Sequence, residues 1–253
     1  MKISFLLFLS IIMTLASQSI CAANTFPRSL SDSAIYQAIS DSIIPGAVLC
    51  VVEDGEVSYL QSYGFRSIFP EQSPMTTNTI FDLASLSKPI GSGSAVLLLC
   101  AENRLRINDL VSQYIPQYHA DVQVRHLLTH YSGLPAYMGV IRLDSIYLAR
   151  RIATSRPDFM IDTIATCFRP SGVGEKYRYS CLNFISLQRV VEAIVGTDIN
   201  TYMREKLYNQ LNTYTCNVVD LANFLNTMGA NISGVITSAI IAGIFVATSG
   251  FIQ

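Results

Sequence analysis

A serine and a lysine three positions apart form the most chemically suggestive pair in this sequence. Ser85 and Lys88 lie within residues 81–89, at the start of an apolar stretch. A serine hydroxyl becomes an effective nucleophile only when a neighbouring group takes its proton. Residues i and i+3 share one face of a helix, so the Lys88 amine can point at the Ser85 hydroxyl. We expect burial to lower the pKa of Lys88 and favour its proton-accepting form. The pair is typical of the S-x-x-K motif of acyl-transfer enzymes; the alternative is a serine that caps a helix and a solvated lysine.

A second candidate segment, residues 174–184, carries Tyr179 and, two positions later, Cys181. A tyrosine with a lowered pKa can act as a general acid or base, and a nearby ammonium group favours the phenolate. The chain has 13 tyrosines, so Tyr179 taken alone is more typical of a core side chain.

Two other constellations are weaker. His126 and His130 have the i, i+4 spacing of metal ligands, but the glutamate of H-E-x-x-H and a third ligand are missing, so we expect no metal. A thiol hydrolase built on Cys181 and a histidine has no supporting local signature.

Composition limits the classes of protein that fit. The chain has 253 residues, 50% of them hydrophobic and 14% charged, with a net charge of −1. This composition allows a sizeable core and argues against long disorder. Because no basic cluster exists to neutralise phosphates, we expect no nucleic-acid partner.

The first residues are typical of an export signal. Lys2 precedes an apolar run over residues 3–16, and small residues at 21–23 resemble a cleavage site. We therefore predict a signal peptide over residues 1–23 and a secreted or periplasmic protein; the alternative is an uncleaved anchor. Cleavage would leave five of the six cysteines, so at least one thiol is free, and we interpret most of the cysteines as small buried apolar residues.

The remaining pattern predicts the elements that must position these residues. Asp54-Gly55 predicts a hairpin between strands 47–52 and 56–63. We expect a helix over 31–43, capped by Ser31 or Asp32, and a helix over 85–101 whose apolar second half is buried. Further helices are predicted from residue 108 to Pro116 and over 122–130, 181–195 (ended by Gly196) and 199–209. Strands followed by many helices favour an α+β or α/β architecture.

Four segments in this order resemble the superfamily of serine beta-lactamases (class C-like), penicillin-binding proteins, D-alanyl-D-alanine carboxypeptidases and related esterases. They are residues 81–89, 124–135, 179–181 with the helix that follows, and 201–211. The resemblance covers residues 35–216 and implies an α+β fold of beta-lactamase/transpeptidase type, an antiparallel sheet flanked by helices.

The same resemblance implies roles for the site residues. Ser85 would be acylated, Lys88 would assist, and Tyr179 would shuttle the proton to the leaving group. The backbone N–H of Ser85 would form half of an oxyanion hole. Cys181 falls at the substrate-binding position where the family has Asn or, in some members, Asp.

Two features depart from the family pattern. A thiol is a weak hydrogen-bond partner, so we expect Cys181 to lose contacts with Lys88 and with a substrate amide. The third family motif has its nearest counterpart at residues 248–251, without the usual Lys or His. We therefore divide the chain into the signal peptide, a hydrolase domain over 24–216 and a shortened apolar segment over 217–253, with incomplete C-terminal strands. We expect the chain as given to fold poorly or to be inactive.

The functional prediction is a serine hydrolase that forms a Ser85 acyl-enzyme on an ester, a beta-lactam or a D-Ala-type peptide, without a cofactor. Its partner would be a small-molecule or cell-wall peptide substrate. One alternative is a catalytically impaired or truncated relative that binds cell-wall peptide or a protein partner. Another is a membrane-tethered protein held by residues 232–253, although a core strand or a truncated end is favoured there.

Overall fold

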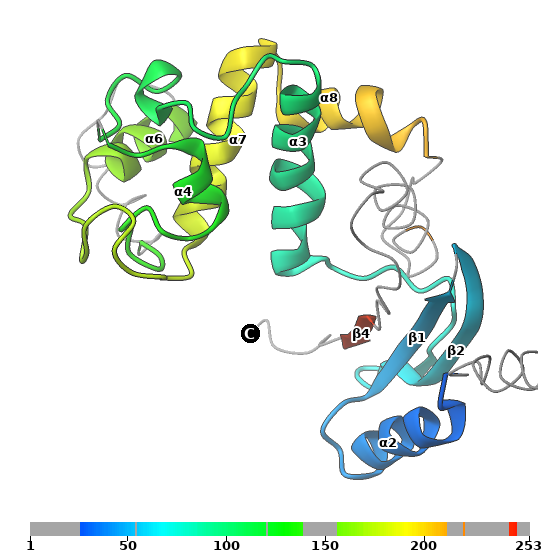
Figure 1. The fold of residues 1–253 in the computed structure, drawn as a ribbon. Helices are drawn as coiled ribbons and strands as arrows, with labels where there is room; N and C mark the ends of the chain where they lie inside the picture. The colour runs from blue at the N-terminus through cyan, green and yellow to red at the C-terminus, as the bar shows by residue number, and fades with distance from the viewer. Residues whose placement is uncertain are drawn as a thin grey trace, which may run out of the picture. The chain divides into compact units, whose positions relative to one another are not determined.

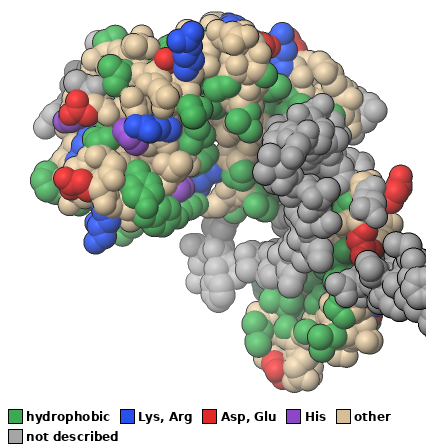
Figure 2. All heavy atoms as spheres, viewed as in Figure 1, with side chains coloured by type: hydrophobic (Ala, Val, Ile, Leu, Met, Phe, Trp, Pro, Cys, Tyr) green, Lys and Arg blue, Asp and Glu red, His purple; other side chains and the backbone are tan. Residues whose placement is uncertain are grey.

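The computed structural model describes residues 26–53, 55–119, 121–138, 156–211, 220 and 243–246. The chain divides into two compact units. The sheet unit comprises residues 1–81 and 217–253, and the helical unit comprises residues 82–216. The predicted signal peptide and the segment 248–251 lie outside the described residues. On the face shown in Figure 2, the acidic and basic side chains are interspersed, in keeping with the net charge of −1.

The sheet unit contains a four-stranded antiparallel sheet in the order β3-β2-β1-β4. Its strands are β1 (Gly46–Glu53), β2 (Glu56–Ser67), β3 (Ser73–Pro74) and β4 (Gly243–Val246). The predicted hairpin is confirmed, because Glu53 pairs with Glu56 and Gly55 takes a φ of 84° between them. Strands β1 and β2 are longer than predicted. From the apolar C-terminal segment, the described residues contribute β4, which pairs with β1.

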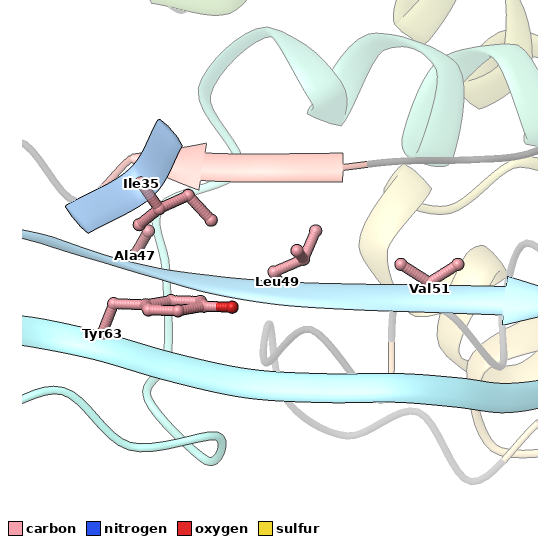
Figure 3. Packing of buried hydrophobic residues seen from close by; sticks show 5 residues of the cluster. All are labelled: Ile35, Ala47, Leu49, Val51 and Tyr63. Atoms are coloured by element: carbon pink, nitrogen blue, oxygen red, sulfur yellow. The ribbon is translucent and has the colours of Figure 1, made fainter. Parts of the chain in front are cut away.

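Both faces of β1 are buried, which explains its continuous apolar run. Ala47, Leu49 and Val51 alternate on one face and pack with Tyr63 and with Ile35 of α2 (Arg28–Ser40) (Figure 3). The intervening side chains pack with a second apolar cluster on the opposite face. The hairpin therefore gains two apolar layers, and each fully buried aliphatic side chain contributes roughly 1.5–3 kcal/mol.

Helix α2 differs from its prediction at both ends. It begins at Arg28, directly after Pro27, so Asp32 lies inside the helix and is not its cap. The Asp32 carboxylate instead accepts hydrogen bonds from the hydroxyls of Tyr59, at 2.6 Å, and Tyr63. At the other end the helix stops at Ser40, and Ile43 is 72% exposed.

The helical unit is organised around α7 (Cys181–Val195) (Figure 1). This helix contacts α3 (Ser94–Ala101), α4 (Val124–Leu128), α6 (Arg156–Thr166) and α8 (Ile199–Met203). Its predicted limits are confirmed: Ser180 caps the first turn by accepting the Leu182 N–H, and Gly196 ends the helix with a φ of 76°. Leu187 of α7 is fully buried. The other elements are η1 (Ala84–Leu86), η2 (Lys88–Gly93), η3 (Val111–Gln113) and η4 (Arg204–Tyr208).

The helix predicted over 85–101 is present, but it changes pitch along its length. A 3₁₀ turn (η1) and a π turn (η2) precede the regular α3. The burial predicted for its second half holds on one side of the helix: Ala95, Val96 and Leu99 are fully buried, whereas Leu97 is 48% exposed. The run Ala84–Ala101 is long and apolar enough to cross a membrane by composition, with a mean hydropathy of 1.2, but buried core helices of this length meet the same criterion.

The helix predicted over 199–209 is present as α8 followed by η4, whereas the two other short helices are shorter than predicted. The segment from residue 108 to Pro116 forms the single 3₁₀ turn η3. There the Asp109 carboxylate accepts the Arg106 N–H and the Tyr114 hydroxyl, which holds a turn in place of a longer helix. The helix predicted over 122–130 is limited to α4, because His130 takes a φ of 62°.

Candidate active site

The backbone just before Ser85 is held in an unusual conformation. The Asp82 carboxylate accepts the Ala84 N–H at 2.8 Å, and Ala84 takes a φ of 42°. A left-handed conformation costs a residue with a side chain roughly 1 kcal/mol or more. Such strain concentrates at functional sites, where the surrounding structure holds a side chain in a required place. Here the strained conformation of Ala84 sets the direction in which the backbone enters the 3₁₀ turn that carries Ser85.

Three predicted site residues meet at the Ser85 hydroxyl. Lys88 Nζ donates to Ser85 Oγ at 3.1 Å, as the i, i+3 spacing predicted. The Tyr179 hydroxyl donates to the same oxygen at 2.8 Å, from the segment that leads into α7. The Lys88 ammonium also lies 5.2 Å from the centroid of the Tyr179 ring. The structure thus brings a nucleophile candidate within proton-transfer distance of two titratable groups.

The electrostatics of Lys88 differ from the prediction. Burial lowers the pKa of Lys88, as expected, but the Tyr179 hydrogen bond and the neighbouring Cys181 raise it by more. The net pKa of Lys88 is therefore above its ordinary value, which favours the ammonium form over the proton-accepting form expected from burial alone. The sequence could not reveal this, because both opposing groups come from the distant 179–181 segment.

The pKa of Tyr179 shifts in the opposite direction, below its ordinary value. Its hydrogen bond with Lys88 lowers the pKa of Tyr179 most, and its bond with Ser85 lowers it further. The ammonium of Lys88 therefore favours the phenolate form of Tyr179. Of the two groups beside Ser85, Tyr179 is the one whose pKa shift favours the deprotonated, proton-accepting form.

Cys181 is the first residue of α7, and its side chain is exposed. The neighbouring Cys181 thiol contributes to the raised pKa of Lys88, and the expected loss of a hydrogen-bonding contact between the two stays a prediction. Whether a substrate amide also meets this thiol stays a prediction.

The ring of His130 packs against the ring of Tyr179. From the sequence this histidine was considered only as a metal ligand and was not identified as a residue of the Ser85 site. Its ring centroid is 4.7 Å from that of Tyr179, and its Nδ1 accepts the Ser180 N–H at 3.2 Å. His126, which the spacing paired with it, instead accepts the Gln123 N–H at 3.1 Å through its own Nδ1. The two histidines therefore serve separate backbone donors. The described residues contain no group of three His, Cys, Asp or Glu side chains that could hold a metal ion.

Two buried polar residues, Ser132 and Asn183, form a hydrogen-bonded path that leads to the His130 ring. The Ser132 hydroxyl donates to Asn183 Oδ1, and Asn183 Nδ2 lies 3.0 Å from His130 Nδ1. Ser132 and Asn183 are buried, at 1% and 0% exposure. Asn183 is a polar residue at a buried position of α7, and that placement was the sequence signal that could have identified it.

An open pocket of about 410 Å³ adjoins Ser85. Lys88 is the charged residue among the described side chains that line it. Its other lining side chains are mainly apolar or aromatic and include Leu83, Leu86, Pro89, His130, Tyr179 and Phe184.

Comparison of the sequence with models of known protein families identifies the family of this chain. Residues 32–220 match the family model described as Beta-lactamase. The chain belongs to the Beta-lactamase family. The resemblance predicted from residues 35–216 is thus confirmed over nearly the same span.

Individual relatives agree with this membership. Penicillin-binding protein 4* of Bacillus subtilis (strain 168) is 30% identical over 167 residues, covering 64% of this chain and 35% of that protein. A putative D-alanyl-D-alanine carboxypeptidase of Escherichia coli (strain K12) is 27% identical over 187 residues, covering 66% of this chain and 42% of that protein. This Beta-lactamase family chain therefore spans well under half of the length of these curated relatives.

The solved structures support the predicted fold. An octameric penicillin-binding protein homologue from Pyrococcus abyssi superposes with a TM-score of 0.66 at 19% identity, covering 82% of this chain and 57% of that one. A putative beta-lactamase from Bacteroides dorei DSM 17855 superposes with the same TM-score, and the match covers 64% of that chain. The prediction of an α+β, beta-lactamase/transpeptidase-like fold is confirmed.

Proposed function

We propose that this protein is a serine hydrolase that works through an acyl-enzyme on Ser85. The observation that carries the proposal is the pair of hydrogen bonds at Ser85 Oγ, from Lys88 at 3.1 Å and Tyr179 at 2.8 Å. Membership of the Beta-lactamase family, with relatives named as carboxypeptidases and penicillin-binding proteins, supports a hydrolase.

In this mechanism Tyr179 is the general base and Lys88 stays an ammonium. Loss of the Tyr179 proton reverses its hydrogen bond, so that Ser85 then donates to the phenolate. Ser85 Oγ attacks the substrate carbonyl carbon as its proton moves to Tyr179, and Tyr179 passes that proton to the leaving group as the acyl bond breaks. In a second step water attacks the acyl carbon and gives a proton to Tyr179, the bond between Ser85 Oγ and the acyl carbon breaks, and Tyr179 returns the proton to Ser85 Oγ. The Ser85 N–H is the proposed half of an oxyanion hole, and one such donor contributes about 3 kcal/mol to transition-state stabilisation.

The proposed substrates are esters, beta-lactams or D-Ala-type peptides, and no cofactor takes part. The pocket lining is compatible with these acyl donors, because mainly apolar neighbours can pack against a substrate while Lys88 supplies a positive charge. Export through residues 1–23, and the limits 24–216 and 217–253, stay predictions.

Covalent labelling tests the proposal directly. The chain is incubated with a fluorophosphonate or a fluorescent penicillin, and the labelled peptide is identified by mass spectrometry. We expect the adduct on Ser85 and its loss in Ser85→Ala. Ser87→Ala is the matched control, since Ser87 is an exposed serine two residues away. An adduct on another residue, or equal labelling of Ser85→Ala, would refute the assignment.

A second candidate function is favoured by Cys181, which stands where the resembled family has Asn or Asp. A relative with an impaired site would bind cell-wall peptide or a protein partner without turnover. The two functions separate in the same experiment: labelling of Ser85 followed by release of the acyl group supports the hydrolase, and binding without acylation supports the alternative.

A further inference from the structure

The hydrogen-bond directions around His130 can be assigned in sequence from one backbone donor. The Leu134 N–H donates to Ser132 Oγ at 3.2 Å, so the Ser132 hydroxyl proton is available for its other neighbour. That neighbour is Asn183 Oδ1, which accepts it. In this arrangement the Asn183 oxygen faces Ser132 and its Nδ2 faces His130, at 3.0 Å from Nδ1.

A backbone donor decides the role of His130 Nδ1, and with it the protonation of the ring. An amide nitrogen can only donate, and so can the backbone N–H of Ser180, which lies 3.2 Å from the same Nδ1. His130 Nδ1 therefore carries no proton and accepts both bonds. The ring is neutral with its proton on Nε2.

His130 also holds both chain neighbours of Tyr179. Its carbonyl oxygen accepts the Arg178 N–H at 2.9 Å, while its ring accepts the Ser180 N–H. Between these two bonds the Tyr179 ring lies against the imidazole at a centroid distance of 4.7 Å. One residue thus restrains the backbone on each side of Tyr179 and contacts its side chain.

We propose that His130 is a positioning residue that holds Tyr179 against Ser85, through a neutral ring that accepts at Nδ1. The proposal rests on the proposed function, because Tyr179 acts there as the base. A proton on Nδ1 would turn the acceptor into a donor facing two other donors, which would release Ser180 and disturb the placement of Tyr179.

The surroundings disfavour that protonation. Burial lowers the pKa of His130 most, and the charge of Lys88 lowers it further. The groups that face the ring are Lys88 from η2, the rings of Tyr177 and Tyr179, and Asn183 and Phe184 from α7. The neutral ring therefore persists down to a pH below the ordinary histidine pKa, and the positioning fails only below that point.

Two variants of His130 distinguish the effect of losing the hydrogen-bond acceptor from the effect of losing the imidazole ring. In His130→Asn, Oδ1 can replace Nδ1 as an acceptor that does not titrate, and Asn tolerates the φ of 62° better than most residues. His130→Leu keeps bulk and removes the acceptor. At neutral pH and above we expect His130→Asn to acylate at a rate close to the parent, and His130→Leu to acylate about 100-fold more slowly, as for a catalytic group displaced by about 1 Å. Equal loss in both variants would overturn the proposal.

The pH profile supplies a readout that a merely structural role would not move. In the parent, the logarithm of the acylation rate should fall with slope one below the Tyr179 pKa and with slope two below the His130 pKa. In His130→Asn the slope should stay at one. A slope that steepens at the same pH in His130→Asn would overturn the proposal.

A measurement without substrate keeps the two proposals distinguishable. The chain has three histidines, and long-range ¹H–¹⁵N NMR of the parent, with His130→Asn for assignment, reports which nitrogen holds the proton. A proton on Nε2 supports the positioning role, and a proton on Nδ1 overturns it, even if His130→Leu fails to fold. If the parent reacts with no acyl donor, the proposed function fails while the NMR result still decides the state of His130.

Discussion

Replacing Tyr179 with phenylalanine removes one oxygen atom and should separate chemistry from folding at this site. The hydroxyl donates to Ser85 at 2.8 Å and takes part in a hydrogen bond with Lys88. The ring can remain against His130, at its present centroid distance of 4.7 Å. Because Tyr179 is 43% exposed, losing the hydroxyl should change the free energy of unfolding by at most about 1 kcal/mol.

The effect on acylation should be far larger. General acid–base groups contribute about 10²- to 10⁴-fold to rate, so Tyr179→Phe should acylate at about 1% of the parent rate or less. The alkaline rise in rate, which in the parent follows formation of the Tyr179 phenolate, should disappear. Stopped-flow acylation with a chromogenic ester or nitrocefin measures both effects, and a urea transition checks the fold.

Tyr177→Phe is the matched control for this substitution. Tyr177 is 55% exposed and its ring lies 5.9 Å from the same histidine, whereas the described hydrogen bonds at Ser85 Oγ come from Lys88 and Tyr179. We expect Tyr177→Phe to acylate like the parent. If Tyr179→Phe does so too, Tyr179 is not the base and the mechanism proposed above is wrong.

Three further predictions test the neighbouring groups. Lys88→Ala should slow acylation and move the rise in rate to higher pH, because the lysine no longer lowers the pKa of Tyr179; an unchanged pH–rate profile would contradict this. Cys181→Asn should raise turnover of nitrocefin or an ester, whereas Cys181→Ala should not; a clear loss in the first variant would mean that the thiol is adapted to this site. Asp32→Asn should reduce the pH dependence of the urea midpoint in acid. The two tyrosine hydrogen bonds lower the pKa of Asp32, so its contribution to stability is present above its unfolded pKa, near 3.8, and is lost as the pH falls through the lower folded value; identical acid limbs in parent and variant would contradict that assignment.

The elements that local chemistry determines were predictable from the sequence. Asp54-Gly55 identified the hairpin because few dipeptides suit a two-residue turn, and Gly196 marked the end of α7 because a left-handed residue is needed there. The proximity of Ser85 and Lys88 follows from helical spacing alone.

Features that depend on tertiary contacts were not predictable in the same way. Asp32 has the side chain of a helix cap, but Tyr59 and Tyr63 on β2 bind its carboxylate. His126 and His130 share a spacing that suggests a common face, yet the helix ends at Leu128 and His130 turns towards Ser180. Periodicity carries no information about which distant backbone donor a side chain meets.

The raised pKa of Lys88 changes how the rest of the site should be understood. A neutral lysine would compete with Tyr179 for the Ser85 proton, whereas an ammonium lowers the pKa of the tyrosine and prepares it to accept that proton. A positively charged His130 beside Lys88 would add like-charge repulsion next to the phenolate. The acceptor role of His130 Nδ1 avoids this, because two fixed donors keep the ring neutral. The site can therefore hold one ammonium and one phenolate next to Ser85, with the proton acceptor placed by a group that carries no charge itself.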